Sequence, residues 1–305
     1  MIEISASGAV GLASNDNETA TTRTNGLTPG VRVAFLCVFV GAACLLLAPS
    51  QAWIKTWPQA LTLPATAWIG SGLTTAFEFL KPAARLAAKL LEYPMAGANR
   101  LLVGSPYALT IGVLAALGWH IGGRRMVALV LAGLGFILAS GYWIASMNTL
   151  ALVVVSVPLA LLVGGLIGVF AYEFLSFRRT VETGLDIMQT VPTFAYLTPL
   201  LLLFGFGPVV GLIASVIYAA PPMARNVLLG LQRVEPDIRE AAIMNGATRI
   251  QQLVLVEIPS ASQQIMVGVN QTIMAALSMV IIAAVIGGFN DIGWEVLLTM
   301  RKAAF

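Results

Sequence analysis

Charge is scarce in this chain of 305 residues. Only 10% of the residues are Asp, Glu, Lys or Arg, 58% are hydrophobic, and the mean hydropathy is +0.87. A typical soluble domain carries about 25% charged residues, so this composition excludes a soluble protein. The apolar residues form long continuous runs and not the alternating pattern of an outer-membrane barrel. They predict an all-α, polytopic transmembrane helical bundle.

Lysine, cysteine and histidine are also rare. None of the four lysines follows a glycine, which excludes the phosphate-binding loop that places Lys directly after Gly. Cys37 and Cys44 lie on one helical face but too far apart along the axis to bond to each other, so membrane packing is favoured, and no metal-ligand spacing is present. His120 ends an apolar run, where a solvated or capping role is favoured over a catalytic one.

The apolar runs predict about seven spans. Residues 1–30 are polar and lack the apolar core of a signal peptide, so we expect a disordered cytoplasmic tail. Residues 31–147 are expected to be N-terminal transmembrane helices that include a periplasmic amphipathic segment, 50–105, with Trp53, Trp57 and Trp68. The predicted spans are about 32–49, 105–120, 126–147, 149–172, 185–205 (interrupted by Pro192 and Pro199), 208–222 and 263–288, with a turn at Gly122-Gly123 and a tight link at Met147–Thr149.

The arginines give an orientation. Short loops with Arg124, Arg125, Arg178 and Arg179, and a polar segment at 223–262, fall on the cytoplasmic side under the positive-inside rule. Seven spans then leave Arg301 outside, which is unfavourable. We therefore expect that a final span is missing and that residues 291–305 form an incomplete C-terminal segment.

The polar segment carries clear local signals. Pro236 suits the first position of a helix, and Asn245-Gly246 tolerates the left-handed conformation that ends one. Thr248 and Gln251 form a capping box that opens a second helix, and Pro259 ends or kinks it. The sequence therefore predicts a helix, a sharp turn and a second helix on the cytoplasmic face.

A short helix held across the spans is a shape that a groove on a partner protein can bind. Ala241 and Ala242 allow close approach. The alternatives are an ordinary cytoplasmic loop and a helix-turn-helix that binds DNA. Acidic residues offset the charge of the four arginines within 223–262, and apolar spans flank the segment. Nucleic-acid binding is therefore disfavoured.

The segment resembles a known motif. Glu240-Ala241-Ala242, Gly246 and Val256-Glu257-Ile258-Pro259 are similar, at the full spacing, to the EAA loop of ABC importer permeases, with Val256 for the usual Ile and Ile258 for the usual Leu. This resemblance implies the ABC type I importer permease fold, no enzymatic activity or cofactor of its own, and ATP bound by a separate ATPase. The docking residues that it implies are Arg239, Glu240, Ala241, Ala242, Gly246 and Pro259.

Two further stretches, 186–197 and 268–279, resemble the glycine betaine/proline (quaternary amine) branch of these permeases. The resemblance covers about 148–295 and implies a core permease domain, 148–290, in a bacterial inner membrane. It also implies two ATPase subunits, a second permease copy or domain, a periplasmic or surface substrate-binding protein, and surrounding membrane lipid. The expected solute is glycine betaine, proline betaine, choline, carnitine or trimethylamine N-oxide.

Polar residues inside apolar spans mark either a pathway or helix packing. Asn270, Gln271, Met274 and Ser278 lie in one span, and Gln189 and Thr190 precede Pro192 in another. We predict these residues for the translocation path. Hydrogen bonding between helices remains an equal alternative for the first group, and a role of the prolines in packing alone remains an alternative for the second. Glu173, at a span end, is interpreted as an interfacial charge and not as a proton carrier.

Two other classes of function remain as alternatives. An ion-gradient-driven secondary transporter needs ionisable residues inside its spans or inverted repeats, and the span interiors hold almost no charge and no detectable repeat. A membrane scaffold without transport is the third class. Copurification of an ATPase through residues 236–248 would separate the three.

Overall fold

The computed structural model describes residues 29–47 and 65–302, which are almost entirely helical and contain no strand. The predicted all-α class is therefore confirmed. The chain divides into two units, Met1–Trp68 and Ile69–Phe305. In the first unit, α1 (Pro29–Leu47) is apolar and exposed, and Cys37 and Cys44 on it are free thiols. The predicted tail, apart from its last two residues, lies outside the described residues, as do Trp53, Trp57 and the side chain of Trp68.

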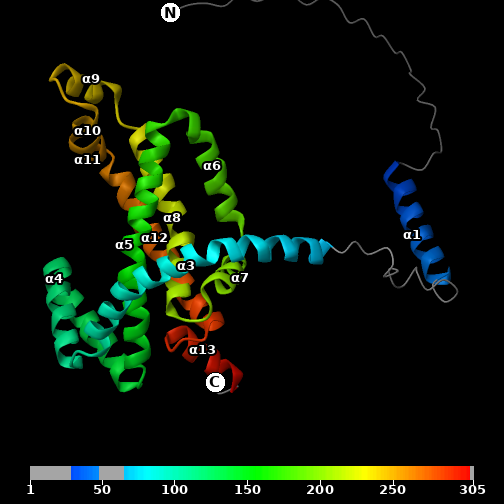
Figure 1. Ribbon diagram of the computed structural model, residues 1–305, viewed down its shortest axis with the longest axis horizontal. Coiled ribbons are helices and arrows are strands. Elements are labelled where there is room, and N and C mark those ends of the chain that lie inside the picture. The colour runs from blue at the N-terminus through cyan, green and yellow to red at the C-terminus, as the bar shows by residue number, and fades with distance from the viewer. Residues whose placement is uncertain (1–28, 48–64, 303–305) are drawn as a thin grey trace, which may run out of the picture. The chain divides into compact units, whose positions relative to one another are not determined.

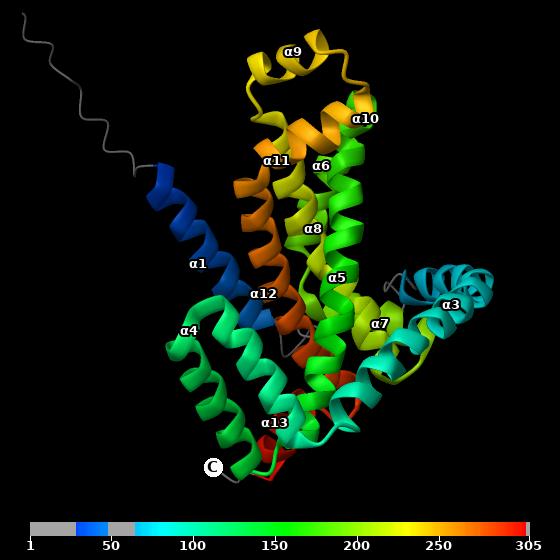
Figure 2. The same cartoon turned by 90° about the vertical axis from the view of Figure 1, so that its left-hand side faces the viewer.

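Three helices form the core of the second unit. Helices α5 (Trp143–Glu173), α8 (Pro208–Gln232) and α12 (Ser262–Gly287) run side by side (Figures 1 and 2). Glycines bring α5 against α8: a Cβ at Gly164 would stand 2.4 Å from the Ala220 carbonyl oxygen, and one at Gly168 2.6 Å from that of Ala224. Small residues allow this close approach of helix backbones.

The loop after α8 begins later than predicted. The polar segment was expected from residue 223, but α8 continues to Gln232. Met223, Val227 and Leu231 are buried in one apolar cluster. This packing stabilises the helix through residues 223–232. The polar residues that suggested a loop have partners on other helices, since Arg225 pairs with Asp186 of α6.

Helices α6 (Leu175–Thr190) and α7 (Thr193–Phe204) form a broken pair bent by 98°. The bend follows Val191-Pro192, because Pro192 disfavours helical backbone in the residue before it. The predicted interruption at Pro192 is thus present, whereas Pro199 lies inside α7 without ending it. Tyr196 donates a hydrogen bond to the Met188 carbonyl across the bend.

Helix α4 (Tyr107–Ala139) is a hairpin of two arms. Gly123 leaves helical geometry at φ +62°, and Gly118 on the first arm faces Met126 and Val130 on the second. The arms run in opposite directions in Figure 2. The turn predicted at Gly122-Gly123 is therefore present.

The predicted link at Met147–Thr149 is wrong. The chain turns at Ser140–Tyr142, where Gly141 adopts φ +80° and the Ser140 hydroxyl donates to the Phe136 carbonyl. Met147–Thr149 lie inside α5, as does the predicted boundary at residue 148. The Asn148 side chain does not form a turn. It donates a hydrogen bond to the Asn290 carbonyl oxygen and accepts one from Asn99.

Within the predicted interfacial segment, residues 65–103 form one helix, α3 (Ala65–Val103), which runs crosswise to α5 (Figure 2). Its Leu91, Met95 and Leu102 pack against Ala151 and Leu152 of α5. The remaining elements are α9 (Pro236–Met244), α10 (Arg249–Gln251), a π-helical stretch (Gln252–Glu257), α11 (Ile258–Ser260) and α13 (Ile292–Arg301).

The predicted count of seven spans is not confirmed. Among the described residues, α4, α5, α8 and α12 are long and apolar enough to cross a membrane, and the α6–α7 pair would be a fifth span. Helix α1 is shorter. This count takes α4 once, although its arms are antiparallel.

Candidate docking loop and polar helix face

The loop between α8 and α12, residues 233–261, projects from one end of the bundle (Figure 2). The predicted helix, turn and helix are present. Pro236 is the first residue of α9, and Gly246 after it adopts φ +76°. At the start of α10, the Thr248 amide donates to Gln251 Oε1 at 2.9 Å and the Gln251 amide to Thr248 Oγ1 at 3.4 Å, which completes the capping box.

Helix α9 presents a mixed polar and apolar surface. Glu240 and Ala241 are exposed, and Ile243 and Met244 are 59% and 87% exposed, while Ala242 is buried against the loop. Exposed apolar side chains beside a charged one are typical of a surface that a partner covers. Gly246 and Pro259 are also exposed. The docking role of these residues stays a prediction.

A buried carboxylate organises the rest of the loop. Glu257 is fully buried, and its Oε1 accepts hydrogen bonds from Tyr172 Oη at 3.1 Å, Arg249 Nη1 at 3.0 Å and Gln252 Nε2 at 3.0 Å. Arg239 Nε lies 3.4 Å from the same oxygen. A carboxylate is taken out of water at high cost unless it is paired and hydrogen-bonded. Glu257 Oε1 is therefore surrounded by donors inside the loop, and two of its neighbours are arginines.

Arg249 ties this cluster to the end of α5. Its guanidinium forms a two-pronged contact with Glu173, with Nε 3.1 Å from Oε2, and lies 5.4 Å from the centre of the Tyr172 ring. The hydrogen bonds that Arg249 donates to Glu173 raise the pKa of Arg249 above its ordinary value. Such paired contacts fix orientation as well as charge. The second half of the loop is thereby fixed to α5.

Arg239 also faces the bundle. Its Nη2 donates to the Leu231 carbonyl at 2.6 Å, at the end of α8, and its guanidinium lies 5.7 Å from the centre of the Tyr172 ring. Of the residues predicted for docking, Arg239 thus joins the cluster of buried contacts, while Glu240 and Ala241 beside it point outward. We call Tyr172, Glu173, Arg239, Arg249, Gln252 and Glu257 the Glu257 cluster.

No role was predicted for Glu257 from the sequence, although the motif contains this residue. A usable signal was present: a carboxylate among apolar residues of a helix, with Arg249 eight positions earlier on the same face. Tyr172 gave no signal, because its role depends on a contact between residues 85 positions apart.

The polar residues of α12 divide into two groups. Gln271 accepts a hydrogen bond from Asn226 Nδ2 of α8 at 2.8 Å, and Asn226 in turn accepts from Gln264 at 2.6 Å. Gln271 therefore bonds between helices, as the packing alternative predicts. Asn270, Met274 and Ser278 share one exposed face of α12 that no other described helix covers. Gln189, Thr190 and Pro192 lie apart from them in sequence, exposed at the α6–α7 bend.

Part of the chain matches a known protein family. Residues 164–303 match the family described as "Binding-protein-dependent transport system inner membrane component". The match contains the loop, the Glu257 cluster and the exposed face of α12.

Curated relatives extend the match. The chain is 35% identical over 292 residues to the trimethylamine N-oxide transport system permease protein TmoV of Ruegeria pomeroyi (88% of this chain, 43% of the relative). It is 36% identical over 231 residues to the glycine betaine/proline betaine transport system permease protein ProW of Escherichia coli (75% and 65%). It is 43% identical over 182 residues to the glycine betaine transport system permease protein OpuAB of Bacillus subtilis (60% and 64%). The chain thus spans less than two thirds of the length of each.

Proposed function

From the match of residues 164–303 to the family of binding-protein-dependent transport system inner membrane components, we propose that the chain is the permease subunit of an ATP-driven ABC importer. It is a multi-pass protein of the bacterial inner membrane. ATP is bound and hydrolysed by a separate ATPase, and this chain supplies the pathway and the docking loop.

The loop carries the proposal. Helix α9 offers Glu240, Ala241, Ile243 and Met244 to a partner, while the Glu257 cluster fixes the loop to α5 and α8. When two ATPase subunits close on ATP, they displace α9. The displacement reaches α5 through Glu257 and Arg249 as a rigid-body movement, and the pathway changes from inward-facing to outward-facing.

The solute that we propose is a compatible solute with a quaternary or tertiary amine. The relatives carry names for transport of trimethylamine N-oxide, glycine betaine and proline betaine; choline and carnitine belong to the same chemical class. A substrate-binding protein captures such a cation in an aromatic cage. The permease then needs only weak contacts, which Gln189, Thr190 and Pro192 at the α6–α7 bend and Asn270, Met274 and Ser278 on α12 supply.

Uptake of radiolabelled glycine betaine into cells that carry the complete transporter tests this function. Glu240→Lys reverses the charge on the docking surface, and Gly246→Val places a β-branched residue at φ +76°, which strains the turn. We expect both variants to lose at least tenfold in uptake while the protein level in the membrane is unchanged. Glu182→Lys on α6, an exposed carboxylate outside the loop, is the matched control.

Normal uptake in both loop variants would contradict the docking role. Uptake that continues without the ATPase and stops when a protonophore collapses the ion gradient would establish the alternative, a secondary transporter.

A further inference from the structure

Helix α3 has three distinct faces. Leu91, Met95 and Leu102 pack on the bundle. A second face is an exposed apolar stripe at helical spacing, which we call the α3 stripe and which consists of Phe79, Leu86, Leu90, Tyr93 and Leu101, each 62% to 86% exposed. The third face carries Arg85, Lys89 and Arg100 with the acid Glu92, and nearer the start of the helix it carries the paired Glu78 and Lys81.

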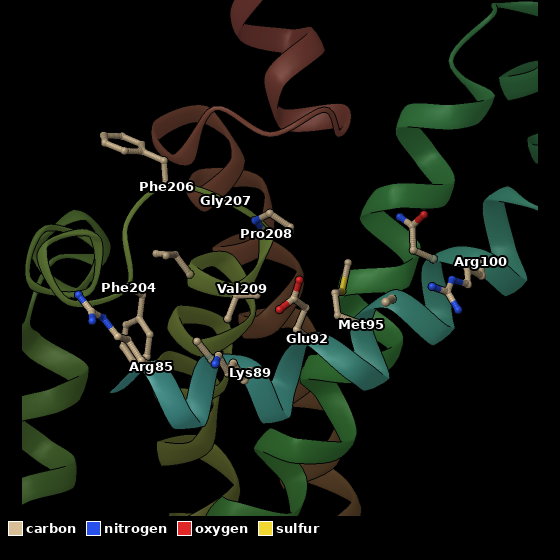
Figure 3. A pocket seen from close by; sticks show the side chains of 14 residues that line it. Arg85, Lys89, Glu92, Met95, Arg100, Phe204, Phe206, Gly207, Pro208 and Val209 are labelled. Atoms are coloured by element: carbon tan, nitrogen blue, oxygen red, sulfur yellow. The ribbon is translucent and has the colours of Figure 1, made fainter. Parts of the chain in front are cut away.

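The charged face lines a cavity. A space of about 710 Å³ lies between α3 and the turn that joins α7 to α8, with Arg85, Lys89, Glu92 and Arg100 on one side and Phe204 and Phe206 on the other. Figure 3 shows the Glu92 and Met95 side chains rising from α3 on the side of Pro208 and Val209, with Lys89 one turn earlier on the helix. A second space of about 450 Å³ along the same helix shares Lys89, Glu92 and Arg100. The two spaces make a groove beside the α3 stripe.

The three cations leave the groove with a net positive charge. In residues 29–47 and 65–302, Arg85, Lys89 and Arg100 make no ion pair, whereas Lys81 on the same helix pairs with Glu78. Glu92 offsets only one of the three charges. A groove with this excess of positive charge attracts an anion, and arginine binds phosphate oxygens through two parallel N–H groups.

We propose that this groove binds phosphate headgroups of anionic membrane phospholipids along its length, with the acyl chains lying against the α3 stripe. A basic face next to an apolar face on one helix is what a membrane surface with anionic lipid requires. The apolar stripe distinguishes this ligand from free phosphate, which has no use for it. The excess of cations distinguishes it from a zwitterionic solute, whose ammonium group would need more than one acid. The inference is independent of which solute the protein transports.

The test measures lipid retained by the purified full-length chain. The probe is phosphatidylglycerol in mixed vesicles with phosphatidylcholine, and native mass spectrometry counts bound lipid after detergent extraction. The variant Arg85→Gln/Lys89→Gln/Arg100→Gln should lower phosphatidylglycerol affinity by about tenfold or more, because each cation near an anionic surface contributes several-fold to binding. The affinity of the wild type should also fall with rising salt.

Two controls separate charge from folding. Arg124→Gln/Arg125→Gln removes two exposed cations of α4 outside the groove and should leave retention unchanged. Arg85→Lys/Arg100→Lys keeps the charge and should retain most of the binding. Equal retention in the triple variant and the wild type would overturn the proposal. So would displacement of the lipid by millimolar inorganic phosphate, or by glycine betaine, because either would assign the groove to a soluble ligand.

Discussion

Two carboxyl groups, those of Glu257 and Asp291, are fully buried in different surroundings. Glu257 directly precedes α11 and Asp291 directly precedes α13, and these two helices lie at opposite ends of the bundle (Figure 2). Glu257 has two arginines within 3.4 Å. Asp291 caps α13 by accepting from the Trp294 amide at 3.1 Å, but its Oδ2 has no partner among the described residues. Burial therefore raises the pKa of Asp291 to about 6 from 3.8. The fold thus opposes ionisation of Asp291 by burying its carboxyl group.

Asp291 gives the bundle a pH dependence with a definite sign. Its folded pKa lies above the unfolded value, so the folded state binds the proton more tightly. The stabilisation is complete below about pH 3.8 and is lost as the pH rises through about 6, with a total of about 3 kcal/mol. Asp291→Asn keeps the cap and removes the charge. Thermal unfolding in detergent between pH 4 and 7.5 should show the variant more stable than the wild type at pH 7.5 and nearly equal at pH 4. A constant difference across this range would contradict the assignment.

At the scale of elements, the local features of the docking loop are predictable from sequence. Pro236, Gly246 and the Thr248–Gln251 box act on partners within a few residues, so their effect is visible in the sequence itself. The π-helical stretch and the burial of Glu257 depend on Tyr172 and on Arg249 paired with Glu173. Such long-range contacts leave no periodic signal in the sequence.

The same distinction explains the helix ends that were predicted wrongly. Asn226, with Arg225 beside it, reads as the start of a loop because it is polar, yet Gln264 and Gln271 of α12 satisfy its side chain. Met147–Thr149 reads as a link because Asn148 favours turns, yet its side chain bonds to residue 290. Gly164 and Gly168 were not singled out, although small residues four apart in an apolar span are a packing signal.

Glu257→Ala tests the loop as one element. Breaking a buried ion pair costs about 3–5 kcal/mol. Because the Arg249 side chain is 45% exposed, we expect a loss nearer 2 kcal/mol, or roughly thirtyfold faster amide exchange. Hydrogen–deuterium exchange should show this increase at residues 236–256, while α12 remains protected. Glu240→Ala, which removes an exposed carboxylate of the same loop, is the control. Unchanged exchange in Glu257→Ala would show that the cluster does not hold the loop.

At the scale of the whole molecule, the bundle of this one chain leaves a polar face uncovered. Asn270, Met274 and Ser278 point away from α5 and α8, and Met274 is 61% exposed. Polar groups facing lipid are unfavourable, so they are expected to face protein or a water-filled cavity. A second permease copy across this face would provide both.

A cysteine at Met274 should report that copy. In a background of Cys37→Ser and Cys44→Ser, which removes two exposed thiols, Met274→Cys should give a covalent dimer with a short bifunctional thiol reagent in membranes. Leu166→Cys, at a 62% exposed position of α5, is the matched control and should stay monomeric. Non-reducing electrophoresis distinguishes the products. Dimers from Leu166→Cys alone would place the partner on a different face.

The Gly123 break in α4 has a consequence for the surrounding bilayer. Each arm holds about 16 residues and, at 1.5 Å per residue, is roughly 24 Å long. The hydrocarbon layer of a typical bilayer is about 30 Å thick. Thinning of the lipid next to the hairpin would relieve this hydrophobic mismatch. We therefore expect this protein to respond to the thickness of the surrounding bilayer.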